Sequence, residues 1–189
     1  ISECMKKYVV LLLFVSTSSL KGYSQSLTEE FNLLIPENKV KSVYAKITVI
    51  DARIDTTNMG IIQKGAFNRK ALLKSPIPLK RQVQHVFKNM ILTDESSTNE
   101  LVLNIRDFKF AEITGAVSET GYCYFRADLF SGKDNAFQKI DSIDAVYEVG
   151  GLDVTKKNIK NGSNKLTHFL ASNASIVKSL KNSQVFSYE

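Results

Sequence analysis

Alternating hydrophobic and polar residues along the chain predict a series of β-strands, each with one buried face. The first strand is expected at residues 43–50, and a short apolar step at Ile61 and Ile62 follows a turn near Gly60. Three longer alternating stretches then come in succession, at residues 101–110, 122–130 and 137–149. Loops of hairpin size separate these three stretches, and we therefore expect them to form an antiparallel meander.

Two of these stretches show further detail. In the first, the bulky apolar residues change parity beyond Ile105, which predicts a β-bulge near Arg106 and Asp107. The second separates a core face from a partly aromatic outer face. The residues expected to face the core are Cys123, Phe125, Ala127 and Leu129. The outer face carries Tyr122, Tyr124 and Phe130, and aromatic side chains on an otherwise polar strand face are common in binding surfaces.

Two amphipathic helices are predicted, one before and one after the meander. Pro78 suits a first helical turn, and residues 79–91 repeat apolar side chains at helical spacing. A second apolar stripe runs over residues 166–180, with Ser163 or Asn164 available as an N-cap. This order of elements predicts an α+β fold, in which a mostly antiparallel sheet carries two main helices packed on one face.

The N-terminal segment has the features of a signal peptide. Lys6 and Lys7 precede eight uninterrupted apolar residues and a serine-rich exit, and the apolar run is too short to span a bilayer as a helix. We interpret residues 1–4 as an over-extended start, 5–24 as the signal peptide, 25–42 as a linker segment and 43–189 as a single domain. Because residues 184–189 begin an element without completing it, the domain is expected to continue beyond them.

Composition and charge narrow the expected partners. The chain is 43% hydrophobic with a net charge of +6, and its charges are arranged in blocks. Seven basic and no acidic residues lie in 56–93, whereas twelve acidic and five basic residues lie in 94–153. A modest charge on an exported chain argues against nucleic-acid binding. It is compatible with an envelope protein or an anionic envelope polymer as partner.

Few residues suggest chemistry. After the predicted cleavage Cys123 is the only cysteine, so no internal disulfide is expected, and its apolar context indicates a small buried side chain. His85 and His168 have no other His or Cys at ligand spacing, and therefore neither a metal nor a cofactor is predicted. Asp51, Arg53 and Asp55 cluster after the first strand, where a structural Asp–Arg pair and a small catalytic or ligand site are the two interpretations.

Two resemblances accompany these patterns. The leader ending at residues 22–26 and the segment 47–60 (ITVIDARIDTTNMG) resemble uncharacterised exported proteins of the Bacteroidota. Over residues 43–63, a strand followed by Asp51-Ala52-Arg53 and an apolar-Gly step is similar to envelope lipoproteins of the YajG type. The cysteine that would carry the lipid in such lipoproteins is missing after the apolar run. Neither resemblance implies catalytic residues.

Two functional hypotheses follow. The first is a non-catalytic binding or assembly module of the bacterial cell envelope. It would be located in the periplasm, at the outer membrane or outside the cell, and would bind a partner through Tyr122, Tyr124 and Phe130. The second is a secreted hydrolase or small-ligand-binding protein with its site near Asp51, Arg53 and Asp55. A concave pocket at Asp51 and Arg53 would favour the second hypothesis, and a flat aromatic surface would favour the first.

Overall fold

The computed structural model describes residues 27–65, 67–93, 98–134, 136–175 and 186–187. The strands are β1 (Leu27–Glu30), β2 (Val40–Ser42), β3 (Tyr44–Asp51), β4 (Asn58–Lys64), β5 (Arg69–Lys74), β6 (Ile91–Thr93), β7 (Asn99–Thr114), β8 (Glu119–Lys133), β9 (Ala136–Gly151) and β10 (Phe186–Ser187). The helices are α2 (Leu79–Met90) and α3 (Thr155–Ala174). The predicted signal peptide lies outside the described residues.

The main sheet has the order β1-β5-β4-β7-β8-β9-β10, and β3 also pairs with β7. The long strand β7 is central because its first half pairs with β3 and its second half with β4, both parallel to it. The pairs β7–β8, β8–β9 and β4–β5 are antiparallel, so the expected meander is confirmed. A small parallel pair, β2 with β6, lies beside the end of α3.

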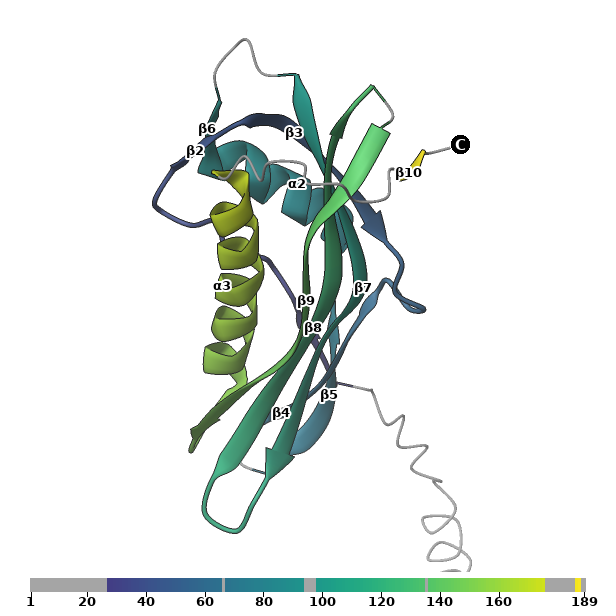
Figure 1. The fold of residues 1–189 in the computed structure, drawn as a ribbon. Coiled ribbons are helices and arrows are strands. Elements are labelled where there is room, and N and C mark those ends of the chain that lie inside the picture. Colours follow the sequence, from purple (N-terminus) through teal and green to yellow (C-terminus); the bar gives the residue numbers. More distant parts are fainter. Residues whose placement is uncertain (1–26, 66, 94–97, 135, 176–185, 188–189) are drawn as a thin grey trace, which may run out of the picture.

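Both helices lie on one side of the sheet (Figure 1), as the α+β prediction required. The apolar stripe of α2 is buried, from Leu79 through Val83 to Met90, each 0% exposed. Five phenylalanines form the centre of the core through successive edge-on or tilted ring contacts, and they are Phe31, Phe108, Phe110, Phe125 and Phe169. The sheet therefore has an inner face that is covered by the helices and an outer face that turns away from them.

Several local predictions are confirmed. The register of β7 against β8 shifts between Ile105 and Asp107, where the bulge was expected. Cys123, Phe125, Ala127 and Leu129 are all buried on the inner face. The bulge explains how both ends of β7 keep their large apolar side chains on the inner face, since one extra residue reverses the alternation.

The prediction of a linker at residues 25–42 is wrong for residues 27–42, the part that the structure describes. Residues 27–42 contribute β1 and β2, and Phe31 is fully buried in the core while Leu33 is 8% exposed. The backbone N–H of Phe31 also donates to the carbonyl of Lys74, which continues the pairing of β1 with β5. The segment is therefore part of the domain rather than a connection to it. Strand β5 was also missed, because its basic residues hide a short alternation of Ala71 and Leu73.

Helix α3 begins at Thr155, eight residues before the predicted cap at Ser163. Ser163 is instead fully buried within the helix, so neither it nor Asn164 is the N-cap. The first turns of α3 face the sheet with Asn158 and Gly162 in place of large apolar residues, and this composition concealed the helical period. Gly162 brings the helix close to the sheet, because a Cβ there would lie 2.5 Å from Phe110 Cε1 and 2.7 Å from Cys123 Sγ.

Candidate functional site

The outer face of the sheet carries a group of exposed apolar side chains, here called the outer-face patch: Ile61, Ile113, Tyr122, Tyr124 and Val146. Their exposed fractions are 45% for Ile61, 59% for Ile113, 40% for Tyr124 and 58% for Val146, while Tyr122 is half-buried. Exposed apolar side chains are normal when scattered singly, but a contiguous group marks an interaction surface.

The sheet register places these residues side by side. Ile61 of β4 is opposite Ala111 of β7, and Ala111 is opposite Tyr122 of β8. One row away, Tyr124 of β8 is opposite Val146 of β9. Residues opposite each other in a sheet point to the same side, and their Cβ atoms lie about 5 Å apart. The outer-face patch therefore extends over four neighbouring strands.

Phe130 does not belong to the outer-face patch. It is half-buried and pairs with the buried Val102, farther along β8. Between the two regions lies Asp128, which forms ion pairs with Arg106 (Nη2 to Oδ2, 2.6 Å) and Lys139 (Nζ to Oδ1, 2.5 Å). The structure thus brings together Tyr122 and Tyr124 of the predicted aromatic face and separates Phe130 from them.

Arg53 and Asp51 form a buried ion pair that organises the loop after β3. The guanidinium binds the Asp51 carboxylate through two contacts of 2.8 Å, from Nε to Oδ1 and from Nη2 to Oδ2. It also donates to the carbonyls of Thr56 (2.8 Å) and Phe108 (3.4 Å), and Nη1 lies 3.0 Å from Met59 Sδ. Arg53 is 5% exposed, so these internal partners use the donors that a ligand would need.

Asp55 does not join Asp51 and Arg53 in a common cavity. It is exposed, and its Oδ1 accepts hydrogen bonds from the backbone N–H groups of Thr57 and Asn58 and from the Thr57 hydroxyl. These hydrogen bonds, from Asn58 first and then from Thr57, lower the pKa of the Asp55 carboxyl. The residue thereby closes a local turn, which is a common role for aspartate in loops.

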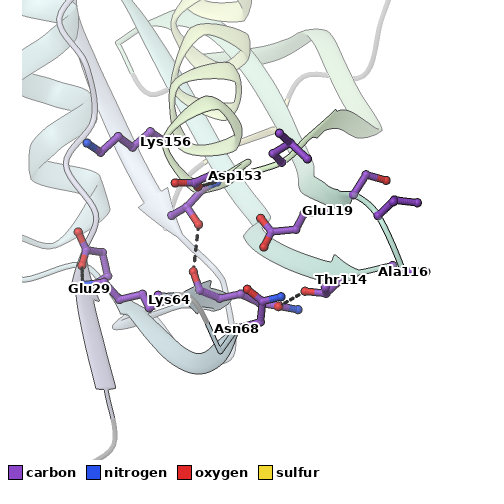
Figure 2. A pocket seen from close by; sticks show the side chains of 15 residues that line it. Glu29, Lys64, Asn68, Thr114, Ala116, Glu119, Asp153 and Lys156 are labelled. Atoms are coloured by element: carbon purple, nitrogen blue, oxygen red, sulfur yellow. Dashed lines mark hydrogen bonds and ion pairs between the residues drawn. The ribbon is translucent and has the colours of Figure 1, made fainter.

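A cavity of about 670 Å³ lies where α3 begins, beside Thr114 at the end of β7, whereas Asp51 pairs with Ile105 in the middle of that strand. Figure 2 shows Asp153 and Lys156, near the start of α3, on one side of the cavity and Lys64 and Asn68 of the β4–β5 hairpin on the other, and Thr114 and Glu119 also line it. The backbone N–H groups at the start of α3 already have carboxylate partners, because Val154 donates to Glu119 and Thr155 donates to Asp153, each at 3.3 Å.

Sequence reasoning missed Glu112, which lies behind this cavity. The side chain is 9% exposed, and its Oε2 accepts from the backbone N–H of Gln63 and from the Thr155 hydroxyl, each at 2.8 Å. Burial raises the pKa of the Glu112 carboxyl, and the hydrogen bonds only partly offset that effect. Its Oε1 is buried without a partner among the described residues. The alternation of residues along β7 does not show that Glu112 is buried, because its burial depends on helix α3, which is distant in the sequence.

The remaining side chains that could take part in chemistry are Cys123 and the two histidines, and they do not form a site together. Burial, with a smaller contribution from Asp107, raises the pKa of the Cys123 thiol to about 12, so it is protonated and unreactive at neutral pH. His85 and His168 are exposed. Within the described residues, no three His, Cys, Asp or Glu side chains are grouped to hold a metal ion. In that same part of the chain, no helix has the length and apolarity to cross a membrane.

The fold and the site define a two-layer α+β domain, in which helices cover one face of the sheet and the other face carries the outer-face patch among charged residues. No family model matches the chain, and no curated protein matches it. Among solved structures, an uncharacterised protein has a TM-score of 0.42 and 10% identity, over 79% of this chain and 97% of the other. A Xanthomonas campestris protein of the DUF330 family has a TM-score of 0.45 and 12% identity, over 78% and 93%.

A hypothetical protein from Chlamydia trachomatis has a TM-score of 0.28 and 9% identity, over 72% of this chain and 92% of the other. None of these three is described as a Bacteroidota protein or as a lipoprotein of the YajG type, so those resemblances remain predictions. Likenesses as weak as these carry no information about the function of this chain.

Proposed function

We propose that this protein is an exported, non-catalytic binding or assembly module of the bacterial cell envelope, and that it holds a protein partner on its outer-face patch. The observation that carries the proposal is the exposure of Ile61, Ile113, Tyr124 and Val146 on neighbouring strands. Exposed apolar surface of this kind is unfavourable in water and becomes favourable when a partner covers it.

The hydrolase or small-ligand hypothesis has less support. The cavity described above is lined by other residues, and Asp51, Arg53 and Asp55 are not among them. Arg53 is engaged with Asp51, Thr56 and Phe108, and Asp55 closes its own turn. These contacts support the structural Asp–Arg interpretation of the sequence over the ligand-site interpretation.

Export is tested by fractionating cells that express the full chain and measuring the intact mass of the protein in each fraction. We expect a species that starts near Gln25 in the periplasm, the outer membrane or the medium, because Lys6 and Lys7 and the following apolar run direct export. An uncleaved species confined to the cytosol would contradict the envelope location.

Partner binding is tested with the double substitution Tyr122→Ala and Tyr124→Ala. After cross-linking in cells, we expect the variant to lose the partners that the unmodified chain retains, because both rings contribute to the outer-face patch. The matched control is His85→Ala, which changes an exposed side chain on α2 and leaves the sheet untouched. Unchanged capture by a folded double variant would refute binding through this face.

A further inference from the structure

The two sides of the outer-face patch carry opposite charges. On β5, Lys70 and Lys74 flank Leu72, and on β9, Asp144 and Glu148 flank Val146. Because side chains alternate along a strand, Lys70, Leu72 and Lys74 all lie on the outer face of the sheet. Asp144, Val146 and Glu148 lie on the same outer face for the same reason. Leu72 is opposite Ile61, and Val146 is opposite Tyr124. An apolar centre thus lies between a basic strand and an acidic strand.

These charges are available to a partner. All four side chains, Lys70, Lys74, Asp144 and Glu148, are exposed, and none of them forms an ion pair within the described residues. Glu30 of β1 lies opposite Lys74 at the edge of the sheet, and Lys109 of β7 lies opposite Tyr124, near the centre. Lys70 has no acidic residue opposite it, because its partner on β4 is Gln63. Asp144 lies opposite Arg126 of β8, and no ion pair joins these two among the described residues.

The position of β7 makes this pattern self-complementary. In the order β5-β4-β7-β8-β9, β5 and β9 stand two strands to either side of β7, about 10 Å from it. A two-fold axis that runs along β7, between two sheets packed face to face, exchanges β5 with β9 and β4 with β8. The basic strand of each copy then lies over the acidic strand of the other. The register sets Lys74 over Val146, one row from both Glu148 and Asp144, and Ile61 over Tyr122. Lys109 faces its own copy across the axis, with Asp107 of its own strand 3.8 Å away.

We propose that the outer-face patch binds a second copy of this chain, as a symmetric dimer in which two sheets pack face to face along this axis. The inference rests on the proposed function, since it names the partner of the same surface. Sheets stacked face to face lie about 10 Å apart, with their apolar side chains between them. Symmetric packing of one face against itself is the commonest arrangement of soluble homo-oligomers.

The test is a pair of charge reversals, studied by sedimentation velocity on protein purified from cells that express the full chain. One variant carries Asp144→Lys and Glu148→Lys, and the other carries Lys70→Glu and Lys74→Glu. Each variant alone opposes like charges twice in the dimer, and we expect its dissociation constant to rise by more than about tenfold. When the two variants are mixed, opposite charges face each other at both contacts, and we expect a heterodimer to form.

The matched control is Lys80→Glu with Lys88→Glu, which makes the same change of charge as the Lys70 and Lys74 variant, but on exposed residues of α2. This control should dimerise like the unmodified chain, and circular dichroism should show that every variant is folded. A chain that stays monomeric at every concentration, or a dimer that both reversals leave unchanged, would overturn the proposal. The binding function itself would then still be judged by the Tyr122 and Tyr124 variant, whose loss of other partners does not require a dimer.

Discussion

At the scale of single residues, buried charges stabilise the fold rather than serve a reaction. The Arg53 and Asp51 side chains are 1% and 6% exposed, and they hold the loop after β3 against the carbonyl of Phe108 on β7. Removing one member of such a pair leaves the other charge buried without compensation. The strand and turn on either side of Arg53 were predicted from sequence, but its burial depends on Met59 and Phe108, which only the folded chain brings to it.

We therefore expect Arg53→Ala to reduce the free energy of unfolding by about 3–5 kcal/mol. Urea denaturation measures this loss, and Arg81→Ala, which changes an exposed arginine on α2, is the control that should remain within about 0.5 kcal/mol of the unmodified chain. If Arg53→Ala were as stable as the control, Arg53 would not be a structural residue, and the ligand-site hypothesis would regain support.

The buried carboxyl of Glu112 leads to a second prediction, which concerns how the free energy of unfolding depends on pH. Burial raises the pKa of its carboxyl in the folded chain, so folding favours the protonated form. The contribution of Glu112 to the free energy of unfolding is fully present below the pKa of the carboxyl in the unfolded chain, about 4.3. It is lost as the pH rises through the higher pKa that the carboxyl has in the folded chain. Glu112→Gln removes the charge and keeps an oxygen for Gln63 and Thr155, and we expect it to stabilise the fold by about 1 kcal/mol at pH 7.

The gain from Glu112→Gln should shrink as the pH falls toward about 4, because the unmodified carboxyl is then protonated as well. Thermal unfolding of both proteins across this range measures the difference, with Glu37→Gln in an exposed loop as the control. A gain that is absent at pH 7, or one that does not change with pH, would show that the ionised carboxylate is well accommodated.

At the scale of elements, strands and helices with strong periodicity were predictable and those with polar inner faces were not. The stripe of α2 and the alternation of β8 follow from their own residues, and both were located correctly. The first half of α3 was missed because Asn158 and Gly162 face the sheet. Asn158 is fully buried and donates to the carbonyls of Ala111 and Tyr122, which no local pattern indicates.

The close approach of α3 to the sheet gives a prediction at this scale. Alanine favours a helix over glycine by about 1 kcal/mol, but a Cβ at position 162 would meet Phe110 and Cys123. We expect Gly162→Ala to destabilise the fold by about 1–3 kcal/mol, because the core must shift to admit the methyl group. Gly150→Ala is the control, since nothing lies within 4 Å of a Cβ at that position. Equal stability of the two variants would mean that α3 packs less tightly than described.

At the scale of the whole molecule, the sheet has two unlike faces, one covered by helices and one that carries the outer-face patch. The α+β class and the single helix-covered face could be predicted, because they follow from the order and amphipathicity of the elements. The composition of the outer-face patch could not. Ile61 and Val146 join Tyr122 and Tyr124 only through pairings among β4, β7, β8 and β9, and β4 and β7 are far apart in sequence. For the same reason, Phe130 was grouped with the two tyrosines although Asp128 and its ion pairs separate it from them.

The most direct test of the central claim is photo-cross-linking in living cells from single positions on the surface. A photoreactive amino acid replaces Tyr124 or Val146 in the outer-face patch, or His85 on α2 as the control. We predict light-dependent adducts from the first two positions and none from the third, with a mass that identifies the partner as a second copy or as another envelope protein. Adducts from all three positions alike, or from none of them, would contradict the assignment of the outer-face patch as the binding surface.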